Sequence, residues 1–281
     1  MRSFNPVRLA VPVSCAAAVA LLLVSADVAA QSRVDVRPLP KPGAVIHVTA
    51  RQEVLMRVGD KPEEPGPAYM HFKNALTFTQ TNGTFSPEGK LDAQIAIERL
   101  ELDESLGGAP RKGPDTSGVE GRILVVTFDR SGKLVGIKVP PDLREVSSRI
   151  TQLLAGAYGI VNFLPSVELS VGEETVQTTE LPMRLPGNVS QGPLAAKTTL
   201  KLRAVEKRGP DRIARLQQSI EVATATTQIQ MMGGGTIDVN LDRGFVSGTE
   251  TEWKISGTMQ TKDSTPGPPF FGSIKINVTA N

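Results

Sequence analysis

Apolar and polar residues alternate along most of the chain after residue 44. In the stretch 46–58 the even positions are mainly apolar and the odd positions mainly polar, which is the period of a strand with one buried face. The same period predicts strands at 72–81, 91–102, 134–139, 198–204, 213–222, 237–241, 245–261 and 274–278. The almost continuously apolar segment 122–128 predicts a strand that is covered on both faces. Segment 213–222 also fits a helical spacing, but its position after the turn at Gly209 favours a strand.

Three segments depart from the plain alternation. Within 91–102 the apolar positions change from odd to even, which predicts a bulge near Glu98 and Arg99. The segment 103–120 is rich in Gly, Pro and charge, so we expect a long loop. Glycines 233–235 lead into the strand at Ile237, whereas a phosphate-binding loop leads into a helix, so they predict a flexible bend.

One main α-helix is predicted at 142–163. Asp142 and Glu145 have the spacing of a capping box, and Pro165 follows the last helical position. Apolar residues recur through this segment at helical spacing and form a stripe on one face, namely Leu143, Val146, Ile150, Leu153, Leu154, Ala157 and Val161.

These elements predict a mainly β fold, with antiparallel strands in curved half-barrel or sandwich-like sheets and the one helix. We expect a single β-rich domain at 44–281, with two halves, 44–139 and 167–281, joined by the helix. The turn sequences at 128–134 and 241–246 are similar, which indicates an internal duplication. The alternative is that Asp and Gly recur there because hairpin turns favour them.

The N-terminus has the pattern of a secretory signal peptide at 1–30. Arg2 and Arg8 precede an apolar run at 9–24, and small residues lead to a cleavage site after Ala30. The run is short for a membrane span and is interrupted by Pro12. We therefore expect export to the periplasm or the extracellular space, no stable span after cleavage, and a Pro-rich lead-in at 31–43; an uncleaved anchor is the alternative.

Charge and cysteine content exclude several classes of function. The 31 Lys and Arg residues balance 29 Asp and Glu residues, and removal of 1–30 leaves 29 against 28. A nearly neutral chain has no field to attract nucleic acid. Cys15 lies in the signal peptide, so the mature chain has no disulfide and no thiolate nucleophile.

No motif predicts a catalytic residue, a metal site or a cofactor. Asp238, Asn240 and Asp242 have the spacing of a calcium loop, but the Gly and Glu that complete such a loop are absent, and strand alternation explains the same spacing. His47 and His71 could serve a metal or a general base, but no third partner accompanies them. We therefore interpret both as surface histidines.

The step from Leu164-Pro165 to Val171-Gly172-Glu173-Glu174, followed by strands and a Gly-rich hairpin, resembles a family of exported bacterial β-rich proteins of unknown function. That family has Asp where this chain has Glu173, and an aromatic residue soon afterwards. More distantly, strands wrapped around a helix resemble the half-barrel of periplasmic lipoprotein carriers. The resemblance implies an apolar ligand and no catalytic residues.

The size of the helix predicts where such a ligand would bind. A helix of about 22 residues is ~33 Å long, whereas about eleven strands make a sheet ~50 Å across. We therefore expect an apolar cleft beside the helix, and a fully closed core is the alternative. The predicted lining residues are Leu153, Leu154, Ala157, Val161, Leu200, Leu202 and Ile237.

The function predicted from these features is non-catalytic binding of an apolar small molecule, a lipid or an envelope protein. A carboxylate-dependent hydrolase of the periplasm is the second hypothesis, because that chemistry requires neither Cys nor His.

Overall fold

The computed structural model describes residues 33–59, 70–164, 167–181, 194–223, 230–260 and 266–281, of which Val34–Asn281 form one compact unit. Long antiparallel strands dominate this unit, and the described residues include a single α-helix, so the predicted fold class is confirmed. None of the helices in these ranges has the length and apolar character needed to cross a membrane.

The strands are β1 (Val34–Asp35), β2 (Val45–Val58), β3 (Met70–Phe85), β4 (Leu91–Leu106), β5 (Ala109–Arg111), β6 (Ile123–Phe128), β7 (Leu134–Lys138), β8 (Glu168–Leu169), β9 (Glu174–Leu181), β10 (Leu194–Arg208), β11 (Asp211–Ala223), β12 (Gln230–Asn240), β13 (Phe245–Gln260) and β14 (Pro266–Ala280). The helical elements are η1 (Pro141–Leu143), α2 (Ser147–Gly159) and η2 (Ile160–Phe163).

One large antiparallel sheet contains all strands except β1 and β8, which pair with each other. The order across it is β7-β6-β4-β3-β2-β14-β13-β12-β11-β10-β9, with β5 beside β4. The chain starts in the middle at β2, proceeds outward to β7, and returns from the opposite edge at β9 to β14, which pairs with β2. In the described residues the edge strands do not pair with each other, so the sheet is open.

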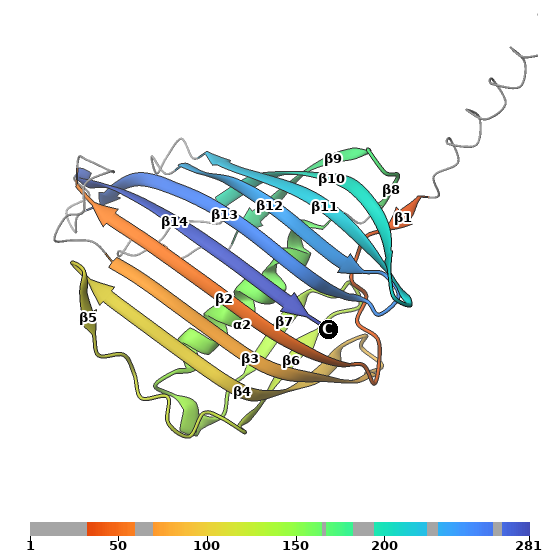
Figure 1. Cartoon of the computed structure of the whole chain (residues 1–281), viewed down its shortest axis with the longest axis horizontal. Coiled ribbons are helices and arrows are strands. Elements are labelled where there is room, and N and C mark those ends of the chain that lie inside the picture. Colours follow the sequence, from red (N-terminus) through yellow and green to blue (C-terminus); the bar gives the residue numbers. More distant parts are fainter. Residues whose placement is uncertain (1–32, 60–69, 165–166, 182–193, 224–229, 261–265) are drawn as a thin grey trace, which may run out of the picture. The chain divides into compact units, whose positions relative to one another are not determined.

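The segment between β7 and β9 connects opposite edges of the sheet and therefore has to cross one of its faces. Figure 1 shows α2 behind the sheet, on the face that we call the inner face. The expected continuous helix at 142–163 is three pieces: η1, α2 and η2. The predicted capping box is wrong, because Val146 is the N-cap and provides no side-chain bond, while the Asp142 carboxylate pairs with Arg122 at 3.0 Å.

Two local predictions about the strands are confirmed. Thr77 on β3 lies opposite Arg99 and Phe78 lies opposite Ile97, so Glu98 is the extra residue of the predicted bulge. The ambiguous segment 213–222 lies within β11 and pairs with β10 and β12 along its length.

Two other local predictions are wrong. Strand β4 extends to Leu106 and forms a hairpin with β5, so part of the expected loop at 103–120 is sheet. Glycines 233–235 lie inside β12 in register with both neighbours, instead of forming a bend before it. A Cβ on Gly235 would lie 1.9 Å from the Glu250 carbonyl oxygen, so these glycines allow neighbouring strands to approach closely.

Candidate ligand-binding interior

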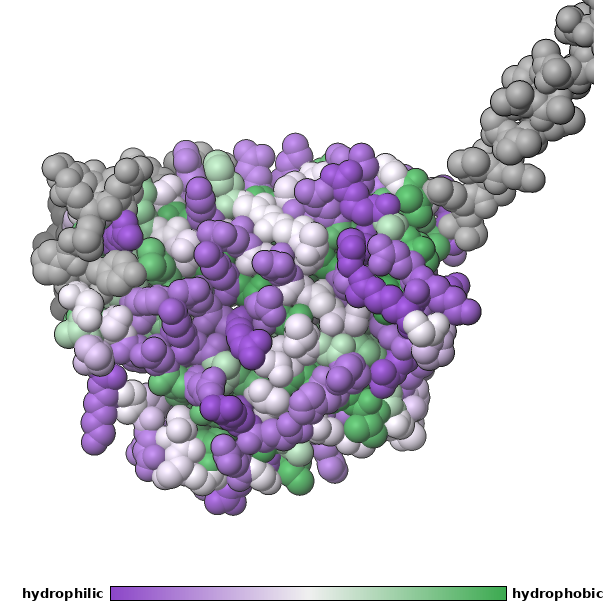
Figure 2. Space-filling model, in the orientation of Figure 1, coloured by the Kyte–Doolittle hydropathy of each residue, from purple (hydrophilic) through white to green (hydrophobic). Residues whose placement is uncertain are grey.

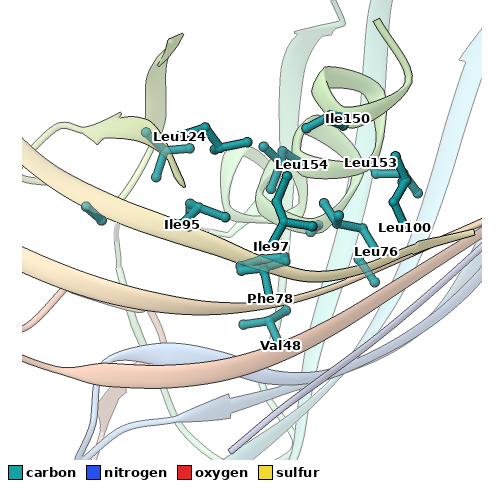
Figure 3. Close-up of a cluster of buried hydrophobic side chains, with 14 of the residues drawn as sticks. Val48, Leu76, Phe78, Ile95, Ile97, Leu100, Leu124, Ile150, Leu153 and Leu154 are labelled. Atoms are coloured by element: carbon teal, nitrogen blue, oxygen red, sulfur yellow. The ribbon is translucent and has the colours of Figure 1, made fainter. Parts of the chain in front are cut away.

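The inner face of the sheet carries two apolar clusters. The first cluster packs α2 against β2, β3, β4 and β6, and Figure 3 shows Leu153 and Leu154 of the helix facing Leu76, Phe78 and Ile97 of the sheet. The second cluster packs η2 and the residues around it against β10, β11 and β12. Its members include Val36, Ile160, Val161, Leu164, Leu169, Leu200, Leu202, Leu216, Ile220, Ile237 and Val239.

The seven residues predicted to line a cleft divide between these clusters. Leu153, Leu154 and Ala157 belong to the first cluster, and the other four, Val161, Leu200, Leu202 and Ile237, belong to the second. All seven are buried. The structure therefore buries them in two groups on the inner face rather than along one wall, and their role in ligand binding stays a prediction.

Five neutral polar residues lie on the inner face within and between the clusters. We call Asn74, Thr198, Gln218, Thr249 and Thr251 the inner polar set. None of them is more than 5% exposed. The amide oxygen of Asn74, both amide atoms of Gln218 and the three threonine hydroxyls have no hydrogen-bond partner in the protein. A buried polar group left in this state costs about 1–3 kcal/mol, so this interior is not optimised as a dry core.

A small crevice opens where α2 ends. Its volume is about 50 Å³, and its lining comes from the Pro-rich lead-in, β2, β14 and the end of the helix, including Pro38, Ile46, Val48, Tyr158 and Val161. Pockets for small molecules are typically about 300–1,000 Å³. In this closed arrangement the crevice holds a few waters at most, so an apolar ligand needs the crossover segment to move.

Tyr158 fastens the end of α2 to the sheet. Its hydroxyl donates to Gln80 Oε1 at 2.5 Å, Gln80 Nε2 donates to Asn82 Oδ1 at 2.6 Å, and Asn82 Nδ2 donates to the Lys41 carbonyl at 2.9 Å. The ring of Tyr158 also packs edge-on against Phe128, with centroids 5.1 Å apart. Burial raises the pKa of the Tyr158 phenol, so it remains a donor at every physiological pH.

The rest of the helix is held less strongly. Its N-cap, Val146, makes no side-chain cap bond, and α2 contains Gly156 and Gly159, which lower helix propensity. At its N-terminal end Arg149 forms an ion pair with the buried carboxylate of Glu104 on β4, and its guanidinium lies 5.0 Å from the Phe72 ring centroid. Polar contacts therefore fasten α2 near both ends, and between them the helix is held on the inner face by the buried side chains of Ile150, Leu153 and Leu154.

The outer face of the sheet has a different character. Figure 2 shows mostly hydrophilic side chains on the face that looks toward the viewer in Figure 1. A broad hollow of about 1240 Å³ is lined by charged residues, including Lys73 and Lys275, and also by Asn74, Leu100, Thr251 and Ile276. These lysines pair with Glu53 at 3.7 Å and with Glu252 at 3.8 Å. The lining of this hollow is therefore mixed, with its charged residues in ion pairs.

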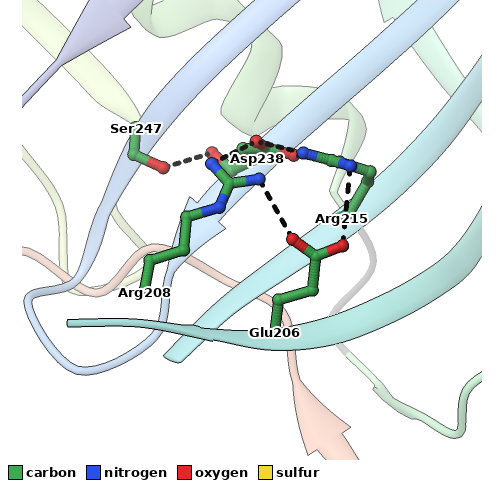
Figure 4. A network of polar contacts seen from close by, with 5 residues as sticks. All are labelled: Glu206, Arg208, Arg215, Asp238 and Ser247. Carbon is green, nitrogen blue, oxygen red and sulfur yellow. Dashed lines mark hydrogen bonds and ion pairs between the residues drawn. The ribbon is translucent and has the colours of Figure 1, made fainter. Parts of the chain in front are cut away.

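The calcium-like spacing belongs to a network of ion pairs. Asp238 contacts Arg208 at 3.1 Å and Arg215 at 3.0 Å, and Glu206 bridges the same two arginines (Figure 4). Asp242 pairs with Arg212 at 2.7 Å. The hydrogen bond and charge of Asp238 raise the pKa of Arg215. Among the described residues, no group of three His, Cys, Asp or Glu side chains is arranged to hold a metal ion.

The two histidines lie on separate parts of the outer face. His47 bonds Glu98 at 3.1 Å, and His71 bonds Glu53 at 2.7 Å. The residue of β2 opposite His71 is Leu55, eight positions from His47, so the two rings do not form one site. The His71 hydrogen bond, assisted by the charge of Lys73, holds the pKa of the Glu53 carboxyl below its ordinary value.

The comparisons with known proteins support the fold. No protein family and no curated protein matches the sequence. A solved structure entitled "Lipid-protein interactions in lipovitellin" matches 86% of this chain at 12% identity with a TM-score of 0.50. DynF from the dynemicin biosynthesis pathway of Micromonospora chersina matches 87% at 7% identity and a TM-score of 0.23, which is too low to carry an argument. The chain spans 25% of the lipovitellin chain, so the shared feature is the β-rich fold.

Sequence reasoning did not single out the inner polar set. Gln218 occupies an inward position of β11 between Leu216 and Ile220, so strand parity contains the signal. A search for alternating apolar residues selects only apolar positions. A polar residue at an inward position, such as Gln218, is then interpreted as exposed to solvent.

Proposed function

We propose that the mature chain is an exported, non-catalytic protein of the cell envelope that binds an apolar ligand between the inner face and the crossover segment. The observation that carries the proposal is the composition of this interior, where two apolar clusters adjoin buried polar groups that no protein atom satisfies. The similar structure, lipovitellin, is one in which lipid–protein interactions were described, and the shared β-rich fold supports an apolar ligand here.

A ligand can bind in this interior only if its contacts with the sheet replace the contacts that α2 makes there. Releasing Ile150, Leu153 or Leu154 from the first cluster exposes a side chain whose burial contributes about 1.5–3 kcal/mol. A bound acyl or isoprenoid chain would restore most of that burial. The ligand would therefore take the place of Ile150, Leu153 and Leu154 on the sheet. The contacts of Arg149 and Tyr158 would set how often α2 leaves the sheet.

A reversible cross-link tests this proposal. The position of a Cβ on Gly156 is 3.7 Å from Ile276 Cδ1 on β14, so a Gly156→Cys, Ile276→Cys pair joined by a short thiol linker would fix α2 on the sheet. The mature chain has no competing cysteine. We expect uptake of a fluorescent alkyl probe to be lost on cross-linking and regained after linker cleavage.

A matched control lies on the outer face. Thr49 and Thr77 have hydroxyl oxygens 3.4 Å apart on neighbouring strands, so a Thr49→Cys, Thr77→Cys pair can be linked without touching the interior. Uptake should be the same with and without that link. Equal uptake by the linked and unlinked helix variant would contradict the proposal and would favour an envelope protein as the partner.

Export is part of the proposal and has its own test. N-terminal sequencing of the protein from the producing cells should give Gln31 as the first residue. A mature chain that begins at Met1 would contradict signal cleavage.

The hydrolase hypothesis receives no specific support from the geometry. The carboxylate nearest the interior, Glu104, is paired with Arg149, and Asp238 and Asp242 are paired with arginines.

A further inference from the structure

The inner polar set forms a continuous patch on β10 to β13, with Asn74 farther along the same face. Leu200, Gln218, Gly235 and Thr251 lie opposite one another on four successive strands, in that order. Thr249 precedes Thr251 by two residues and Thr198 precedes Leu200 by two, so all of these side chains face inward. Because Gly235 has no side chain, nothing from β12 lies between Gln218 and Thr251.

The patch lies beside residues already predicted to contact a ligand. Leu200 is directly opposite Gln218, and Ile237 is directly opposite Thr249. Leu200 and Ile237 both belong to the second cluster, so one molecule could contact this apolar cluster and the polar groups together. Hydroxyl and amide groups enclosed by such a wall suit the polar end of an otherwise apolar ligand.

All members of the inner polar set are uncharged. The amide of Gln218 donates and accepts, and each threonine hydroxyl does both. An anionic headgroup would need a cation, and Arg149 already forms an ion pair with the buried carboxylate of Glu104. A carboxylate or phosphate moved next to Gln218 would lose its hydration without gaining a counter-charge, and this is strongly unfavourable.

We propose that the ligand is a neutral lipid, with ester or hydroxyl groups that hydrogen-bond to Gln218, Thr249 and Thr251. This inference rests on the proposed function and makes it more specific. It predicts selectivity among lipids that carry the same acyl chains, because the apolar wall binds all of them and the polar patch accepts only an uncharged end.

The direct test compares three pyrene-labelled lipids with the same two acyl chains, namely a diacylglycerol, a phosphatidic acid and a phosphatidylglycerol. The delipidated full-length mature protein should bind the diacylglycerol at least about ten-fold more tightly than the two anionic lipids, which is about 1.4 kcal/mol. Equal binding of all three would overturn this inference and leave the proposed function intact. Failure to bind any of them would overturn both.

Near-isosteric variants then separate ligand binding from folding. Gln218→Met and Thr251→Val each remove unsatisfied polar atoms, so we expect the melting temperature of the ligand-free protein to rise and the affinity for diacylglycerol to fall about ten-fold. Thr199→Val is the matched control, because Thr199 follows Thr198 on the opposite face. It should change neither quantity.

The variants also exclude ordered water as the sole occupant of the patch. If both variants lower the melting temperature and bind diacylglycerol as tightly as the original protein, ordered water satisfies these groups and the inference is wrong. If they raise the melting temperature with unchanged affinity, the groups are unsatisfied but do not contact the ligand, and the inference is also wrong. Two sites are used so that a folding defect in one variant leaves the other informative.

Discussion

Replacement of Tyr158 by Phe should loosen the crossover segment without removing the aromatic ring. Gln80 and Asn82 are both buried, and the Tyr158 hydroxyl is the donor to Gln80 Oε1. Its loss leaves a buried acceptor unsatisfied, at a cost of about 2 kcal/mol. For a domain of this size each kcal/mol lowers the melting temperature by about 2–4 °C, so we expect a fall of about 4–8 °C.

The same substitution should accelerate ligand entry. If the hydroxyl stabilises only the closed state, about 2 kcal/mol raises the open population about 30-fold, with a comparable rise in the uptake rate of a fluorescent alkyl probe in stopped-flow measurements. The control is Tyr158→Phe in a Gln80→Leu variant. That variant lacks the amide that accepts the hydroxyl, so Tyr158→Phe should lower its free energy of unfolding much less. A lower melting temperature with an unchanged uptake rate would refute the idea that Tyr158 restrains opening.

Three further substitutions test other parts of the structure. Gly235→Ala should destabilise the protein severely, measured as the urea midpoint, because its Cβ would meet the Glu250 carbonyl oxygen at 1.9 Å. Gly159→Ala, at a site with open space around the Cβ, should instead stabilise it by about 0.5–1 kcal/mol, and equal effects of the two would contradict the packing described. Glu53→Gln should lower stability at pH 7, because the lowered pKa of Glu53 adds stability above its ordinary value of 4.5. The difference from the original protein should vanish as the pH falls through that lowered pKa, and a difference in stability that does not change between pH 7 and acid pH would contradict this explanation.

Local features of the strands could be predicted from the sequence because they depend on neighbouring residues. The change of apolar parity located the bulge at Glu98, and the turn at Gly209 correctly favoured a strand for 213–222. The helix was placed correctly but its first turn was not, because Arg122, distant in the sequence, pairs with the Asp142 carboxylate.

The features that define the site depend on contacts between distant parts of the chain. Pairing of β2 with β14 joins residues more than 200 positions apart and turns the helix into a crossover on the inner face. That arrangement decides which side of each strand is buried, and thus makes Gln218 and Thr251 interior residues. The close approach of β13 to β12 likewise turns glycines 233–235 from an expected bend into the interior of a strand.

We expect the interior of the protein to open and to hold an apolar, uncharged ligand. Native mass spectrometry of the protein purified without detergent from the exported fraction of its own cells tests this most directly. We predict a species heavier than the mature chain by the mass of one neutral lipid, which dissociates at moderate collision energy. A bare chain that also takes up no diacylglycerol in solution would contradict the account.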